Sequence, residues 1–202
     1  MRVLAVLCLV LLAACGRVAW PQGRPAELGP VIAAPDPTVG CDMRVEAPWR
    51  GAAGFRVIAD AVGVACGDAS VSITIAGPRD LTHMASSYQI SQIEGVFGSA
   101  ANARQLTRET MQSALARWID PGAPERRMAV TSDLPRWPHR VAAPRDTTRV
   151  YTPGEGFSRA LYQAVRKDRR PLFCYNAESN TLRCLALLAD GRVILMAVGR
   201  AR

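Results

Sequence analysis

The stretch LFCYNAESNTLRCLALLADGRVILMAV, residues 172–198, sets the fold class of this 202-residue chain. It contains three apolar runs, at 172–177, 182–189 and 192–198, and each run has the length of a strand. Asp190-Gly191 lies between the second and third runs and is typical of a tight two-residue hairpin turn. The segment therefore predicts a C-terminal three-stranded meander.

The last two strands of this meander are apolar on both faces, because leucine, valine, isoleucine and methionine occupy consecutive positions. Strands of this kind lie at the centre of a sheet, with both faces covered by other elements or by a partner. The first hairpin, around residues 178–180, places Cys174 directly opposite Cys184 and within reach of a disulfide.

Upstream of the meander, the sequence contains both strand and helix patterns. Residues 55–59 predict a short strand, and residues 70–76 a better one, because aliphatic side chains there alternate with serine and threonine. Residues 103–119 predict a helix with Met111, Ala114, Leu115 and Trp118 on one apolar stripe. Residues 84–98 fit neither pattern well.

Thr152-Pro153-Gly154-Glu155 has the pattern of a helix capping box with proline at the first helical position. The helix expected after it ends in basic residues, which complement the helix dipole. Residues 121–149 are rich in proline and arginine, and beyond a short strand at 128–131 they predict a long irregular loop. The whole pattern favours an α+β fold with helices packed on an antiparallel sheet.

The first sixteen residues have the features of an export signal. Arg2 supplies a positive charge, and residues 3–14 form an apolar run that is too short for a membrane span of ~20 residues. The run ends in Leu12-Ala13-Ala14-Cys15, which resembles the lipobox of bacterial lipoproteins. This resemblance implies cleavage before Cys15 and attachment of lipid to its thiol. The alternative is an ordinary signal peptide cut at a nearby site.

The resemblance also implies a location. The mature cysteine of this family carries three acyl chains, palmitate among them, and such an anchor holds a protein on a membrane almost irreversibly. Gly16 follows the cysteine, which implies sorting to the outer membrane of a Gram-negative bacterium, facing the periplasm. We therefore expect a signal peptide at 1–14, a flexible proline-rich tether at 15–40, and a single α+β periplasmic domain at 41–202. No family resemblance extends over that domain.

Four cysteines remain once the signal is removed and the lipid is attached. An even number in an oxidising compartment favours two disulfides over a metal site, and the CxxC pairs typical of zinc sites are absent from the sequence. Three pairings are open. Local geometry favours a disulfide between Cys174 and Cys184, and this leaves Cys41 to pair with Cys66.

Basic residues are concentrated in one part of the chain. The sequence has 25 lysines and arginines against 17 acidic residues, and eleven of these bases but only four of the acids lie between residues 126 and 170. Such a region is either a solvated loop or a surface that attracts acidic partners. Nucleic acid is its usual partner, but export argues against it and favours an acidic protein, anionic lipid or lipopolysaccharide. The candidate binding residues are Arg136, Trp137, His139, Arg140, Arg145 and Arg149.

The sequence contains no HExxH, GxSxG, SxxK, P-loop or GxGxxG motif, so we predict no catalytic site, cofactor or metal. Our first hypothesis is a lipid-anchored structural or binding accessory of an envelope assembly. The second is a periplasmic cell-wall or lipid hydrolase, in which the fold brings His83 or His139 to a serine and an acid. The third is a plasmid- or phage-encoded surface-exclusion lipoprotein.

Overall fold

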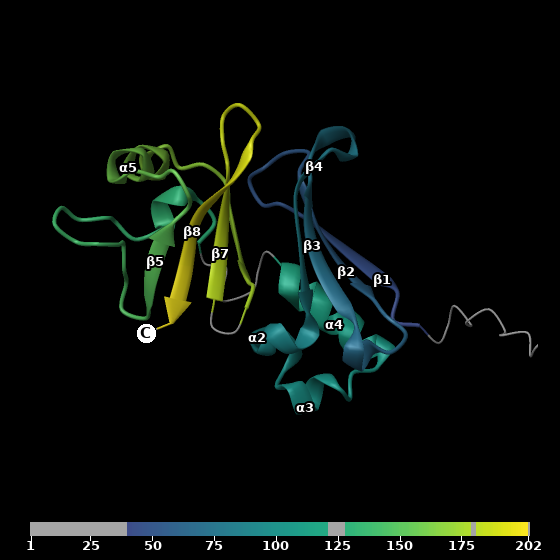
Figure 1. Cartoon of the computed structure of the whole chain (residues 1–202). Coiled ribbons are helices and arrows are strands. Elements are labelled where there is room, and N and C mark those ends of the chain that lie inside the picture. The colour runs from purple at the N-terminus through teal and green to yellow at the C-terminus, as the bar shows by residue number, and fades with distance from the viewer. Residues whose placement is uncertain (1–39, 121–127, 179–180, 202) are drawn as a thin grey trace, which may run out of the picture. The chain divides into compact units, whose positions relative to one another are not determined.

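Two four-stranded antiparallel sheets and several short helices make up the described part of the chain (Figure 1). The computed structural model describes residues 40–120, 128–178 and 181–201, which all belong to one compact unit, Pro35–Arg202. The predicted α+β class is confirmed, with two sheets where the sequence led us to expect one. The predicted signal peptide, Cys15 and nearly all of the tether lie outside the described residues.

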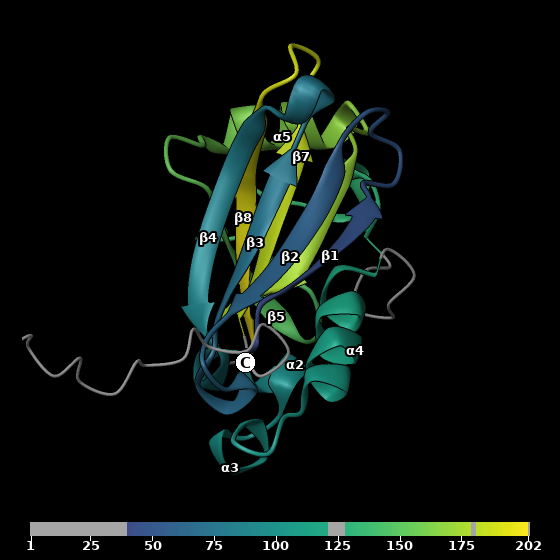
Figure 2. The same cartoon turned by 90° about the vertical axis from the view of Figure 1, so that its right-hand side faces the viewer.

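The strands of the first sheet pair in chain order (Figure 2). They are β1 Met43–Pro48, β2 Arg56–Val62, β3 Ser70–Ala76 and β4 Thr82–Gln89. β3 has the bounds predicted for it, and its alternating side chains Val71, Ile73 and Ile75 are fully buried on one face. The strand expected at 55–59 is β2. β1 was not predicted. β4 includes the first residues of the stretch 84–98, which fitted neither the helix nor the strand pattern well.

Short helices follow β4 before the longer helix that packs on the first sheet. They are η3 Ile90–Gln92, α2 Glu94–Phe97 and α3 Ala100–Ala103, and α4 Arg108–Ile119 then contacts β1 and β2. The helix predicted at 103–119 begins only at Arg108, because Thr107 caps it. The Thr107 hydroxyl accepts from the N–H of Thr110 at 3.3 Å, and the Thr110 hydroxyl accepts from the N–H of Thr107 at 2.9 Å. The predicted apolar stripe of α4 is buried.

The second sheet has the strand order β5-β8-β7-β6. Its strands are β5 Arg149–Pro153, β6 Leu172–Asn176, β7 Thr181–Leu187 and β8 Val193–Ala201. β6, β7 and β8 pair consecutively, Cys174 lies opposite Cys184, and β7 and β8 are the central strands, as predicted. The turn after β7 is longer than the predicted two residues: Leu188 donates its N–H to Arg192 O at 2.9 Å.

The capping box predicted at Thr152–Glu155 is wrong. Thr152 and Pro153 are the last residues of β5, where they lie opposite Val198 and Ala197 of β8. The helix α5, Arg159–Lys167, begins after Ser158, whose hydroxyl accepts from the N–H of Leu161 at 3.2 Å. Proline is tolerated in β5 because it is an edge strand, and pairing with a distant strand outweighs the local helix pattern.

Both faces of the second sheet are buried, in agreement with the apolar pattern of its central strands. Phe173, Tyr175 and Leu185 belong to a core that also contains the inner face of the first sheet and α4. Leu172 and Ala186 belong to a second core, which includes Tyr162 of α5. The second sheet is therefore the layer that separates the two cores.

Both predicted disulfides are present, Cys41–Cys66 and Cys174–Cys184. The first joins the residues just before β1 to η1, Cys66–Asp68, the short turn between β2 and β3. Cys41 also donates its N–H to Gly63 O at 2.7 Å. In the parts of the chain that are described, no helix has the length and apolarity needed to cross a bilayer.

Candidate binding surface

The predicted binding residues lie in the loop between α4 and β5, which is described from Met128 onward. The loop begins with a single bridge between Val130 and Pro171 in place of the strand expected at 128–131. It continues in η5, Thr131–Asp133, where the Asp133 carboxylate accepts from the N–H groups of Ala129 and Val130 at 2.9 and 3.0 Å. Its first residues therefore have a defined backbone conformation.

Side chains of α5 hold the next part of this loop. Arg166 donates from Nε to Leu134 O at 2.6 Å and from Nη2 to Ser132 O at 2.7 Å. One turn earlier on the helix, the Tyr162 hydroxyl donates to Pro135 O at 3.0 Å. Burial raises the pKa of Tyr162 well above its ordinary value, so this hydroxyl keeps its proton. The loop backbone is thus fastened to the helix by side chains.

Trp137 takes part in this attachment. Its indole N–H donates to Val141 O at 2.8 Å, its ring packs edge-on against Tyr162 at 5.8 Å between centroids, and its carbonyl accepts from Gln163 Nε2 at 2.9 Å. The residue is half-buried in this arrangement. Trp137 therefore supports the conformation of the loop.

Asp146 fixes the end of the loop, where the chain enters β5. Its Oδ1 accepts from the N–H groups of Thr148 and Arg149 at 2.7 and 2.8 Å, and its Oδ2 accepts from the Tyr151 hydroxyl at 3.0 Å. Burial alone would raise the pKa of Asp146, but these hydrogen bonds outweigh it and hold the pKa below the ordinary value. Sequence reasoning missed this residue, although aspartate two positions before a threonine is typical of an Asx turn.

The remaining candidates divide by exposure. Arg149 is half-buried at the start of β5, whereas Arg136, His139, Arg140 and Arg145 are exposed. Arg166 belongs to the basic region 126–170, but its guanidinium is hydrogen-bonded to the loop backbone inside the fold. Arg170 pairs with Asp168 at 3.4 Å. The exposed bases of the described loop, of α5 and of the turn after it, which we call the basic surface, are Arg136, Arg140, Arg145, Arg159, Lys167 and Arg169.

Three of the four acids of the same region have partners other than the three loop arginines of the basic surface. Asp133 and Asp146 accept backbone N–H groups, and Asp168 pairs with Arg170. Within the described residues, Arg136, Arg140 and Arg145 form no ion pair. Their charge is therefore available to a partner.

Among the residues that the structure describes, neither histidine forms a salt bridge with a carboxylate. His83 lies on β4 with its ring 5.0 Å from that of Phe55, and the nearby Asp80 pairs with Arg56 instead. His139 is exposed in the loop. Over residues 40–120, 128–178 and 181–201, no three His, Cys, Asp or Glu side chains gather in a way that could hold a metal ion.

No family model, no curated protein and no solved structure matches this chain.

Proposed function

We propose that this protein is an outer-membrane lipoprotein facing the periplasm, without catalytic activity, that serves as a binding accessory of an envelope assembly. The basic surface contacts an acidic partner protein. The observation that carries this proposal is the attachment of the loop to α5 through Arg166 and Tyr162. Beside it lie the exposed Arg136, Arg140 and Arg145, which form no ion pair within the part of the chain that the structure describes.

The fixed backbone of this loop favours a role in binding over the alternative of a loop that is only solvated. Ordering a loop on association lowers affinity, and a loop that is already ordered avoids much of this loss. Each exposed guanidinium also presents a planar fork of donors that matches a carboxylate in two places. Arginines on such a loop suit recognition of aspartate and glutamate side chains.

The anchor and the compartment are supported by Leu12-Ala13-Ala14-Cys15 and by two disulfides, which form in an oxidising space. Mass analysis of the protein purified from its native membrane tests the anchor. We expect a chain that begins at Cys15 and carries acyl groups, and a Cys15→Ser variant should be released from the membrane. An unmodified Cys15, or retention of residues 1–14, would contradict the anchor.

Charge reversal tests the basic surface. In the lipid-anchored protein, Arg136, Arg140 and Arg145 are changed together to Glu, and proteins that co-purify from detergent-solubilised membranes are compared with wild type. A matched control reverses Arg104, Arg117 and Arg200, three exposed arginines outside the loop and α5. We expect the loop variant to lose its acidic partner while the control keeps it, with equal thermal stability for both.

Two results would contradict the proposal. One is unchanged co-purification by the loop variant. The other is a loop variant that keeps all its protein partners but no longer binds vesicles containing phosphatidylglycerol. That result would assign the basic surface to anionic lipid.

A further inference from the structure

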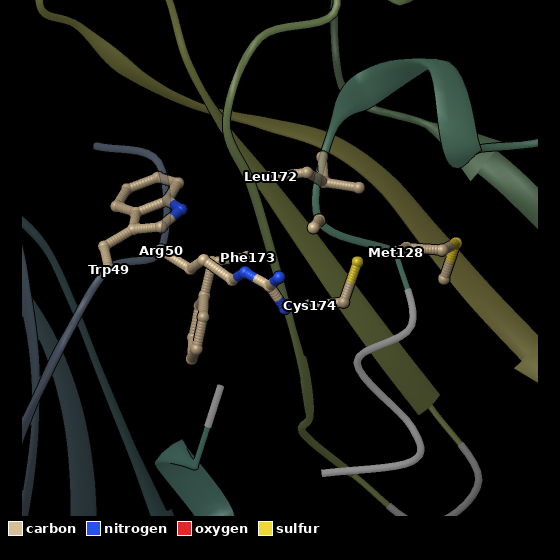
Figure 3. Close-up of a pocket in the computed structure, with 7 residues that line it drawn as sticks. Trp49, Arg50, Met128, Leu172, Phe173 and Cys174 are labelled. Atoms are coloured by element: carbon tan, nitrogen blue, oxygen red, sulfur yellow. The ribbon is translucent and has the colours of Figure 1, made fainter. Parts of the chain in front are cut away.

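A small cavity lies where the loop after β1 meets β6 (Figure 3). Its volume is about 20 Å³, close to the space of one water molecule or one small polar group. The lining residues are Trp49, Arg50, Met128, Ala129, Leu172, Phe173 and Cys174. Most of this wall is apolar, so its few polar groups decide what it can bind.

Trp49 contributes an indole N–H that has no acceptor within the described part of the chain. The residue is 3% exposed, so water does not reach most of its side chain. By contrast, Trp118 donates to Asn176 O and Trp137 to Val141 O, both at 2.8 Å. A buried donor without an acceptor destabilises a fold, and for this reason such groups are rare and point to a missing partner.

Packing holds the indole in this orientation. Its ring lies edge-on to Phe55 and to Phe173, with centroids 6.1 Å away in each case. The backbone of Trp49 is also fixed, since its N–H donates to Phe55 O at 3.0 Å and its carbonyl accepts from Ala52 N at 3.0 Å. The ring cannot turn toward another acceptor without losing its contacts with Phe55 and Phe173.

Arg50 supplies the second donor. The residue is exposed and lines the cavity, and its guanidinium extends toward Cys174 in the view of Figure 3. Within the described residues it forms no ion pair. The cavity thus combines one neutral N–H and one guanidinium, with no carboxylate among its lining residues.

We propose that Trp49 and Arg50 form a binding site for a single carboxylate group. One carboxylate oxygen accepts from the indole N–H, and the negative charge pairs with the guanidinium of Arg50. A neutral amide leaves the guanidinium without a counter-charge, so the charge of Arg50 favours an anionic acceptor. The site is separate from the basic surface, none of whose residues lines the cavity.

The indole N–H resonances of the ¹⁵N-labelled full chain, with both disulfides formed, report on this site directly. Sodium acetate is titrated at pH 7 and constant ionic strength, with acetamide as the neutral probe of similar size. We expect a saturable shift of the Trp49 resonance with acetate alone. Trp118 and Trp137 are internal controls, because their N–H groups are already bonded.

Variants and peptides then identify the second donor and the natural source of the group. Arg50→Gln should weaken acetate binding about tenfold or more, as expected for loss of a charge-assisted contact, whereas Arg44→Gln, an exposed arginine outside the cavity, should not. A capped Gly-Glu-Gly peptide that binds more tightly than acetate identifies a protein side chain as the source, and a peptide that fails to bind identifies a free small acid.

Three outcomes would overturn the site. The Trp49 resonance could stay unmoved by acetate, it could move equally with acetamide, or acetate could bind Arg50→Gln as well as wild type. The second outcome would show that the indole needs only a neutral acceptor such as water.

Discussion

The hydroxyl oxygens of Tyr88 and Tyr175 lie 3.1 Å apart and join β4 of the first sheet to β6 of the second. Both rings are buried, at 7% and 1% exposure. Burial, reinforced by the hydrogen bond with Tyr88, raises the pKa of Tyr175 well above its ordinary value. The pair is a polar contact within the apolar core that the two sheets share.

Removing either hydroxyl of this pair should lower the free energy of unfolding by about 1–2 kcal/mol, because the other hydroxyl loses a buried partner. The double variant Tyr88→Phe/Tyr175→Phe should be more stable than the sum of the single effects predicts. Urea denaturation of the four proteins measures this coupling. Strictly additive losses would show that the two hydroxyls do not interact.

High pH should destabilise the protein through its buried tyrosines. Burial, followed by the charge of Asp146, raises the pKa of Tyr151 from 10.0 to about 12. Because the folded-state pKa lies above that of the unfolded chain, the stabilisation is complete below pH 10 and is lost as the pH rises through 12. Denaturation midpoints between pH 8 and 12 measure the decline, which should be shallower in Tyr151→Phe. An identical decline in both proteins would assign the effect to other groups.

Two neighbouring bases of α5 should differ in role. Arg166→Gln removes a guanidinium that donates to Leu134 O and Ser132 O, so the free energy of unfolding should fall by about 2 kcal/mol. Lys167→Gln removes an exposed charge one position later and should change stability by less than ~0.5 kcal/mol. Equal stability of the two variants in thermal unfolding would contradict the internal role of Arg166.

The two disulfides should contribute unequally. Cys41 and Cys66 are 25 residues apart and Cys174 and Cys184 only 10, so the first cross-link restricts the unfolded chain more. Loop-closure entropy predicts losses of roughly 3.5 and 2.8 kcal/mol when each pair is replaced by alanine. Denaturation of the two double-alanine proteins under oxidising conditions compares them. A larger loss for the Cys174–Cys184 pair would show that native packing around it dominates chain entropy.

Residues close together in sequence determined much of this fold. The alternation in 70–76 gave β3, the apolar stripe gave most of α4, and the short first hairpin placed Cys174 opposite Cys184. Each of these features depends on interactions within a few residues or across one turn, so periodicity and spacing are sufficient to predict it.

The tertiary structure decided the remaining features, because each depends on a partner distant in the chain. Thr152 and Pro153 are strand residues only because β8 lies beside them, which overrides a local helix pattern. The sequence shows that basic residues are concentrated between 126 and 170. Only the structure shows that the Arg166 side chain lies inside the fold, where it donates to the carbonyls of residues 132 and 134. The indole N–H of Trp49, which has no acceptor among the described residues, likewise lies where β6 packs against the loop after β1. Which polar groups are paired inside the fold is set by these long-range contacts.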